Sequence, residues 1–283
     1  MAIIKDIIAD EERAFYAAKN DTFVNIKITG VADGESSFKE CRDVVVNDSY
    51  FNLRYPFWHN DNIVLNNVEM TTNCRAALWY SNKIKMNDSQ LDGIKVYREC
   101  NTINVNNTNI NSPEPFWFCS DININGGSVK GEYAFLKSSN IEIRNLKFGG
   151  KYSFQYVKNL KIYDSVLDTK DAFWHAENVE VYNSIVKGEY LAWYAKNIKL
   201  VNCHIIGTQP ICYSEDIVLE NCTMEGTDFS FEYSSIKADI KGDILSVKNP
   251  YKGYINAGSI GEVIIDDIIL DTDNIVDVLN GEI

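Results

Sequence analysis

The sequence predicts an all-β fold, a single-stranded right-handed parallel β-helix made of 19-residue coils, with a short N-terminal capping helix. Apolar residues recur every 19 positions, a second apolar residue follows each of them by two positions, and Asn, Asp or Gly separates the apolar runs. A spacing of two is the period of a β-strand. Helical repeats are disfavoured because Gly and Asn would interrupt a helix in every repeat. Right-handed winding is expected from the chirality of parallel β crossovers.

The repeat keeps a constant step of 19 residues over nine apolar anchors. These anchors are Ile84, Ile103, Ile122, Ile141, Leu160, Val179, Ile198, Ile217 and Ile236. Val44 and Ile63 continue the phase upstream, and the step of 21 from Ile63 to Ile84 predicts a two-residue insertion. Coils that stack at about 4.8 Å would align the anchors as a column in the core. A leucine-rich horseshoe is the alternative, but the sequence lacks the L-x-x-L-x-L pattern of that fold.

The continuous repeat predicts a single domain over residues 1–283. Within it we expect an N-terminal cap at 1–22, coils at 23–248, and irregular C-terminal strands or a cap at 249–283. The open end of a solenoid exposes strand edges and needs a cover. Residues 10–19, where Asp10 precedes Glu11 and Glu12, are typical of a short amphipathic helix suited to that position.

Composition excludes several classes of function. The formal net charge of −13 disfavours a nucleic-acid partner, which requires a basic surface. No apolar run reaches the roughly 18 residues of a membrane span, and the first residues carry no export signal, so we expect a cytoplasmic protein without a membrane partner. Seven cysteines without a CxxC motif indicate reduced, inert thiols, no metal site and no cofactor.

The third side of each coil carries most of the unusual residues. All five tryptophans share one column, and a column of small residues lies two positions further on. Large aromatic residues next to small ones are typical of a core, so we expect the tryptophans to point inward. The interleaved residues would then face solvent as an aromatic stripe. The opposite orientation, with the tryptophans exposed, stays open, and an aromatic stripe is expected either way.

The coils that begin at Ile141, Leu160 and Val179 hold the richest set of titratable groups. A carboxylate or imidazole between phenols can transfer protons, so we take Asp171, His175 and Glu189 as candidate catalytic residues. Aromatic walls suit sugar rings. The candidate ligand-binding residues are Lys151, Tyr152, Tyr156, Lys170, Phe173, Tyr190, Tyr194 and Arg98.

One observation weakens an enzymatic role for these residues. Asp171 and His175 would lie about 13 Å apart on an extended strand, too far for a direct catalytic pair. Their alternative role is to make an aromatic surface soluble.

Arg98 would pair with a neighbouring carboxylate other than Glu99, because adjacent strand residues point in opposite directions.

Several longer segments resemble a known family. They are 32–40 (ADGESSFKE), 53–59 (LRYPFWH), 93–100 (GIKVYREC), 150–156 (GKYSFQY), 167–178 (LDTKDAFWHAEN), 187–194 (KGEYLAWY) and 207–213 (GTQPICY). They look like the bacterial family DUF3737, and the resemblance covers nearly the whole chain. It implies a pectin-lyase-like β-helix protein with no established activity, and it supplies no catalytic residues.

Two functions of different classes follow from the aromatic stripe. The first is binding or processing of a carbohydrate or related small ligand, with neutral or amino sugars favoured because polyuronates would repel an acidic chain. The second is a non-catalytic interaction scaffold that forms a homo-oligomer through this surface. The sequence does not decide whether the protein is an enzyme.

Overall fold

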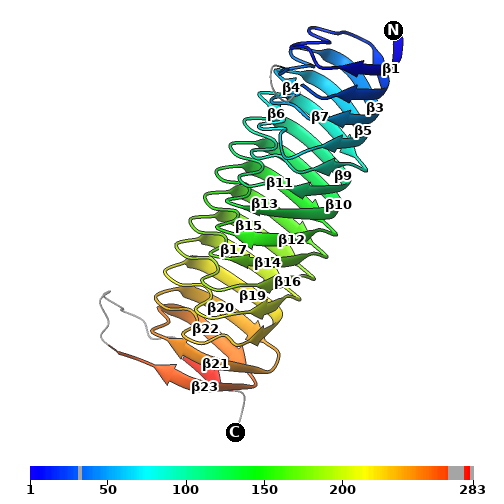
Figure 1. The fold of residues 1–283 in the computed structure, drawn as a ribbon. Helices are drawn as coiled ribbons and strands as arrows, with labels where there is room; N and C mark the ends of the chain where they lie inside the picture. The colour runs from blue at the N-terminus through cyan, green and yellow to red at the C-terminus, as the bar shows by residue number, and fades with distance from the viewer. Residues whose placement is uncertain (31–33, 267–276, 281–283) are drawn as a thin grey trace. The chain divides into compact units, whose positions relative to one another are not determined.

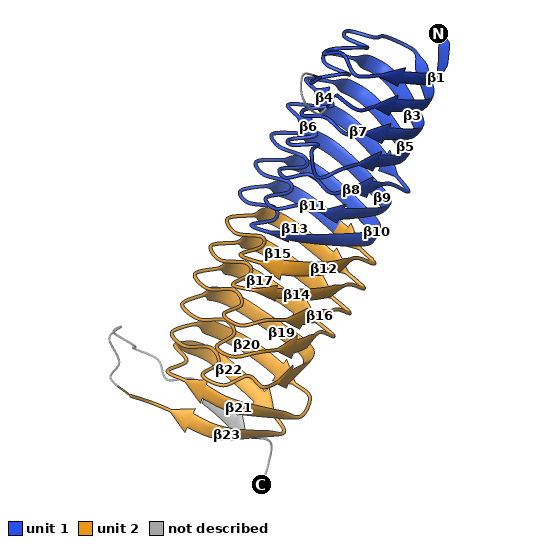
Figure 2. Ribbon diagram, in the orientation of Figure 1, with its two compact units in different colours: residues 1–142 blue, residues 143–283 orange. Residues whose placement is uncertain are grey.

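A computed structural model describes residues 1–30, 34–266 and 277–280 of the chain. The chain is an all-β parallel solenoid of about 14 turns, and its described residues contain no helix. Consequently no helix in that part of the chain is long and apolar enough to cross a membrane. Two compact units are distinguished, Met1–Glu142 and Ile143–Ile283 (Figure 2). The prediction of a single domain therefore stays a prediction.

Unit 1 is a stack of parallel strands (Figure 1). Its strands are β1 (Ile3–Ala9), β2 (Thr22–Ile28), β3 (Arg42–Phe51), β4 (Phe57–Trp58), β5 (Asp61–Met70), β6 (Leu78–Trp79), β7 (Asn82–Asn87), β8 (Gln90–Leu91), β9 (Asn101–Asn111) and β10 (Ser120–Glu132). β1 pairs with β2, β2 with β3 and β3 with β5. β5 then pairs with β7 and β8, both of these pair with β9, and β9 pairs with β10. β11 (Ser139–Arg144) contains the boundary between the units.

Unit 2 repeats this arrangement. Its strands are β12 (Lys147–Lys151), β13 (Lys158–Tyr163), β14 (Val166–Lys170), β15 (Glu177–Tyr182), β16 (Ile185–Lys187), β17 (Lys196–Val201), β18 (His204–Ile206), β19 (Glu215–Glu225), β20 (Ser235–Ile240), β21 (Asp243–Lys248), β22 (Lys252–Ala257), β23 (Ser259–Ile264) and β24 (Asp277–Asn280). β13, β15 and β17 form one side, and β12, β14, β16 and β18 form the next. β19 continues both sides and pairs with β20.

The register between coils confirms the 19-residue repeat. In unit 2 Leu160 pairs with Val179, Val179 with Ile198 and Ile198 with Ile217. These anchors are buried, as expected for a core column. In unit 1 the corresponding column is Val44, Ile63, Ile84, Ile103 and Ile122.

The two-residue insertion lies between β5 and β6. Phe51 pairs with Met70 and Phe57 pairs with Leu78, so the extra residues fall after Met70. A turn in which the Cys74 backbone N–H donates to the Thr71 carbonyl, 2.9 Å away, closes this segment. The register of the core is therefore unchanged by the insertion.

Asparagine and aspartate stand at the corners because these residues tolerate a left-handed backbone. Asn159, Asn178 and Asn197 all have φ near +55° to +58°. Their side chains form a ladder in which Asn178 donates to Asn159 at 3.0 Å and Asn197 donates to Asn178 at 2.8 Å. Each corner thus fixes the backbone bend and joins one coil to the next.

The predicted N-terminal capping helix is wrong. Residues 12–17 are turns, and Arg13 and Ala17 have φ of 56° and 57°, which no α-helix contains. The backbone N–H of Phe15 donates to the Ser37 carbonyl at 2.9 Å, so this segment is the third side of the first coil. The Phe15 ring packs against Phe23 and Phe38 at 4.9 Å, which explains its apolar character.

The third side of a coil is not an ordinary strand, which is a second correction. In unit 2 it runs as turns and bends in which every second residue is left-handed, for example Tyr152, Phe154 and Tyr156 with φ of 57–59°. The strict in-and-out alternation of a β-strand therefore does not apply there. In the coils of Phe154, Phe173 and Ala192 the middle left-handed residue points into the core and the residue after it lies half-buried at the surface.

Candidate functional site

A row of five stacked aromatic rings runs along the third side of unit 2. We call it the aromatic ladder: Tyr156, His175, Tyr194, Tyr213 and Tyr233. Consecutive ring centroids are 4.8, 5.2, 5.2 and 5.5 Å apart. Tyr156 and Tyr194 are 44% and 48% exposed, whereas Tyr233 is buried. Because each ring covers the faces of its neighbours, the ladder presents ring edges and polar ends to solvent.

The predicted position of His175 between Tyr156 and Tyr194 is confirmed. Its imidazole stacks on both phenol rings within 11° of parallel. The ladder therefore contains one imidazole among four phenol rings.

The tryptophans of unit 2 lie at the surface beside the ladder, so their predicted inward orientation is wrong. Trp174 and Trp193 are half-buried and stack at 5.5 Å. Each indole N–H donates to a backbone carbonyl, of Tyr190 at 2.8 Å and Gln209 at 3.0 Å. These bonds hold the rings flat against the coil.

The tryptophans also connect the two edges of the third side. The Trp193 ring contacts Tyr190 at 5.6 Å and Tyr194 at 6.4 Å. The predicted residues Tyr190 and Tyr194 thus belong to one continuous aromatic surface.

Phe173 was predicted to be a ligand-binding residue at the surface, but it lies in the core. It is only 4% exposed and stacks on buried Phe154 at 5.1 Å, inside the core. The left-handed backbone of this side turns the middle residue inward, and a ligand at the surface would not reach it.

Asp171 occupies the opposite edge of the third side, at the same position of its coil as Tyr152 and Tyr190 in the coils on either side. Its side chain is 6% exposed, and burial raises the pKa of the carboxyl, opposed by the positive charges of Lys170 and Lys151.

The remaining predicted residues of this edge form a charged layer around Asp171. Lys170 pairs with Glu189 at 2.6 Å, and this bond raises the pKa of the lysine. The Lys170 ammonium lies 5.2 Å from the Tyr190 ring centre, and Lys151 lies 5.4 Å from that of Tyr152. Glu189 is therefore engaged by a lysine and is not a free general base in this arrangement.

Arg98 belongs to unit 1. Its guanidinium lies 5.7 Å from the rings of both Trp79 and Trp117, and its Nε lies 3.3 Å from Glu99. The expectation that Glu99 could not pair with Arg98 is wrong, because Glu99 is left-handed, with φ of 52°, and the two side chains do not diverge as on a strand.

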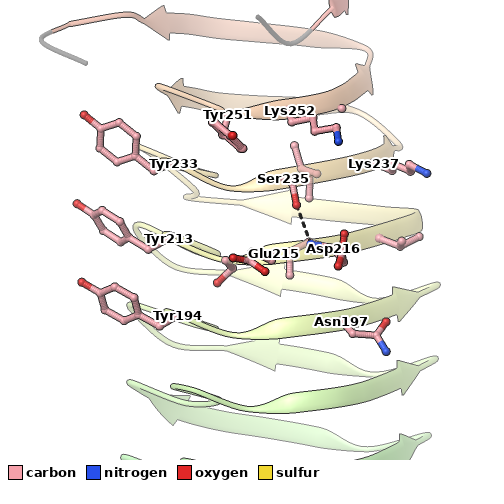
Figure 3. A pocket seen from close by; sticks show the side chains of 15 residues that line it. Tyr194, Asn197, Tyr213, Glu215, Asp216, Tyr233, Ser235, Lys237, Tyr251 and Lys252 are labelled. Atoms are coloured by element: carbon pink, nitrogen blue, oxygen red, sulfur yellow. Dashed lines mark hydrogen bonds between the residues drawn. The ribbon is translucent and has the colours of Figure 1, made fainter. Parts of the chain in front are cut away.

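A groove adjoins the aromatic ladder near the C-terminal part of unit 2. We call it the tyrosine groove, with a volume of about 890 Å³. Tyr194, Tyr213 and Tyr233 stand in a row along it, Glu215 and Asp216 lie further along the coil of Tyr213, and Lys252 lies on the coil after that of Tyr233 (Figure 3). The sequence analysis identified only Tyr194 of these six. Glu215 and Asp216 are adjacent exposed residues directly before the core residue Ile217, and this charged pair was the available signal.

The charges of the tyrosine groove are of both signs. Glu215 pairs with Lys196 at 3.1 Å, and this contact raises the pKa of Lys196. The Asp216 backbone N–H donates to the Ser235 hydroxyl at 2.7 Å, drawn as a dashed line in Figure 3. Lys237 and Lys252 are exposed. The groove is therefore lined by phenols, carboxylates and ammonium groups.

The described residues contain no group of three or more His, Cys, Asp or Glu side chains arranged to hold a metal ion. All seven cysteines are buried and free. Burial raises the pKa of Cys41, Cys74 and Cys212, to about 12, 11 and 12, so these thiols are unreactive at neutral pH.

Solved structures with a similar fold share little sequence with this chain. The surface protein and adhesin PfbA of Streptococcus pneumoniae is 7% identical, with 92% of this chain and 76% of that chain covered and a TM-score of 0.39. The alginate lyase AlyF-OU02 is 10% identical, with 94% and 78% covered and a TM-score of 0.36. The A-module of the mannuronan C-5 epimerase AlgE4 of Azotobacter vinelandii is 10% identical, with 83% and 76% covered and a TM-score of 0.28.

A search among curated proteins finds no significant match. A family model described as a protein of unknown function, DUF3737, matches residues 2–277. That range includes every strand of both units except the last residues of β24, together with the aromatic ladder and the tyrosine groove. The chain therefore belongs to the DUF3737 family.

Proposed function

We propose that this protein binds an extended saccharide along the aromatic ladder and the tyrosine groove of unit 2. The observation that carries the proposal is the row of exposed rings of Tyr156, His175 and Tyr194, one per coil, which half-buried Tyr213 continues beside a groove with charged and hydroxyl groups. Saccharides combine apolar C–H edges with dense hydroxyl groups, and such a row offers partners for both.

The spacing of the ladder favours a polymer over a single sugar. Ring centroids recur at 4.8–5.5 Å from Tyr156 to Tyr233, so a ligand with a similar repeat contacts equivalent groups on every coil. Each added unit then contributes a similar increment to binding.

Neutral or amino sugars are the proposed class of ligand. The chain carries a net charge of −13, and Glu215 and Asp216 line the groove. A polyuronate would bring further negative charge to this surface. We propose binding without turnover, because Glu189 is paired with Lys170 and is therefore not available as a general base beside Asp171. A cytoplasmic location is part of the proposal.

The test is calorimetric titration with neutral and amino-sugar oligomers of increasing length. We expect affinity to rise with length and then level off once the ladder is covered. Tyr194→Phe removes one exposed phenol hydroxyl, and we expect it to weaken binding by about three- to tenfold, in line with the loss of one hydrogen bond.

Tyr182→Phe is the matched control, because it removes a phenol hydroxyl from the preceding part of the same coil, where it bonds Glu180 at 2.6 Å. Its affinity should equal that of the wild type. Equal weakening by both variants, or an affinity that does not depend on oligomer length, would contradict the proposal. Absence of any saccharide binding, together with self-association lost on Tyr194→Ala, would favour the interaction scaffold instead.

A further inference from the structure

The first strand of unit 1 has an open outer edge. β1 pairs in parallel with β2, from Ile3 with Thr22 to Ala9 with Ile28. Among the residues that the structure describes, no other named strand contacts β1 extensively. The predicted capping helix does not cover it, so backbone N–H and C=O groups of β1 are available to a further strand.

This edge is apolar on both of its faces. Ile4 and Ile7 pair with buried Phe23 and with Ile26, so they end two columns of the core. Ile3 and Ile8 lie on the outer face and are 65% and 78% exposed. An open, apolar strand edge is a template for pairing with another chain.

The sequence of this edge is self-complementary. Residues 3–8 read Ile-Ile-Lys-Asp-Ile-Ile, which is symmetric about the bond between Lys5 and Asp6. If a second copy pairs antiparallel about that point, Lys5 faces Asp6 of the second copy and Asp6 faces its Lys5. Ile4 then faces Ile7, and Ile3 faces Ile8.

The same register matches the faces of the strand. Ile4 and Ile7 both belong to the core face, and Ile3 and Ile8 both belong to the outer face. A slip by one residue would place core-face residues opposite outer-face residues and would bring Asp6 opposite Asp6. Charge and burial therefore select one register.

The bend of β1 is compatible with this pairing. Asp6 has φ of 58° and accepts a hydrogen bond from the Asn25 side-chain amide at 2.8 Å, so the strand turns a corner at its middle. Three residues lie on each side of the symmetry point. A two-fold axis through the corner carries one arm onto the other, which an isologous contact requires.

We infer that β1 pairs antiparallel with β1 of a second copy of this chain, with Lys5 opposite Asp6 of that copy. This contact is separate from the aromatic ladder, and it does not depend on the proposed saccharide ligand. It would extend the hydrogen-bonded ladder of unit 1 across the two-fold axis and cover Ile4 and Ile7.

The test uses charge reversal on both sides of the symmetry point. Lys5→Asp creates two Asp–Asp contacts in the dimer, and Asp6→Lys creates two Lys–Lys contacts. Sedimentation equilibrium should show a dimer for the wild type and dimerisation weakened by about tenfold or more for each variant. An equimolar mixture of the two variants restores two opposite-charge pairs, so we expect a heterodimer from proteins that do not pair with themselves.

Lys85→Asp, an equal charge change at an exposed position of β7, is the control and should leave the dimer intact. Left-handed lysines occur in the chain, for example Lys83 with φ of 52°, so Asp6→Lys is compatible with the fold, which far-UV circular dichroism would check. A wild type that stays monomeric overturns the inference. So does a dimer that resists both variants, or one that Tyr194→Ala abolishes.

Discussion

The buried carboxyl of Asp171 makes the stability of the protein depend on pH. Burial raises the pKa of its carboxyl, so the folded protein holds a proton that the unfolded chain has already lost. Its contribution to stability is therefore present at low pH and falls as pH rises through the folded-state pKa. Above that pKa the ionised, buried carboxyl lowers the free energy of unfolding.

Asp171→Asn should remove this penalty. We expect a melting temperature a few degrees above that of the wild type at pH 7, and a difference that shrinks towards zero as the pH falls below 4. Thermal unfolding followed by circular dichroism across this range measures both. Asp168→Asn, at an exposed position three residues earlier, is the control. A variant less stable than the wild type at neutral pH would contradict the assignment.

The stack of buried rings in unit 1 shows what holds one coil on the next. Phe116 is fully buried between Tyr97 at 4.7 Å and Phe135 at 4.6 Å, with all three rings nearly parallel. Phe116→Ala should lower the free energy of unfolding by about 3–5 kcal/mol, because it leaves a cavity between two rings.

Phe118→Ala provides the comparison, since the ring lies two residues away and is 43% exposed. Its cost should stay below about 1 kcal/mol, as for most surface substitutions. Urea denaturation of the two variants measures both values. Similar costs would contradict the described burial of Phe116 and exposure of Phe118.

The strands of this fold could be predicted from the sequence, whereas the third side could not. Apolar anchors at a fixed step determine register, because a strand has only two faces and one of them must be buried. The third side obeys no such period. Residues such as Phe154 and Phe173 adopt left-handed φ without being Gly or Asn, and stacking on neighbouring coils compensates for this cost.

The candidate site was partly predictable for the same reason. Tyr156, His175 and Tyr194 lie 19 residues apart, so their stacking followed from the repeat alone. Tyr194 and Tyr213 are separated by the same step, so their row was predictable, whereas the groove beside them was not, because its lining comes from several coils. The exposed position of Trp174 and Trp193 depends on left-handed neighbours that sequence patterns do not indicate.

In the whole molecule, we expect the two compact units to unfold together. Each coil contacts mainly its neighbours, so stability is close to a sum of local terms. We expect a single calorimetric transition that both Phe116→Ala in unit 1 and Phe173→Ala in unit 2 shift to lower temperature. Two transitions, each moved by only one of the variants, would contradict the predicted single domain.

The constant register of the coils also bears on how such a chain changes over generations. Duplication or loss of a 19-residue segment leaves every ladder in phase, because Leu160, Val179 and Ile198 occupy equivalent places. A partial insertion shifts every later side chain to the wrong face unless a loop takes it up, as the segment after Met70 does. Related chains should therefore differ in length by whole coils. The number of rings in the aromatic ladder would then change by one for each coil that is gained or lost.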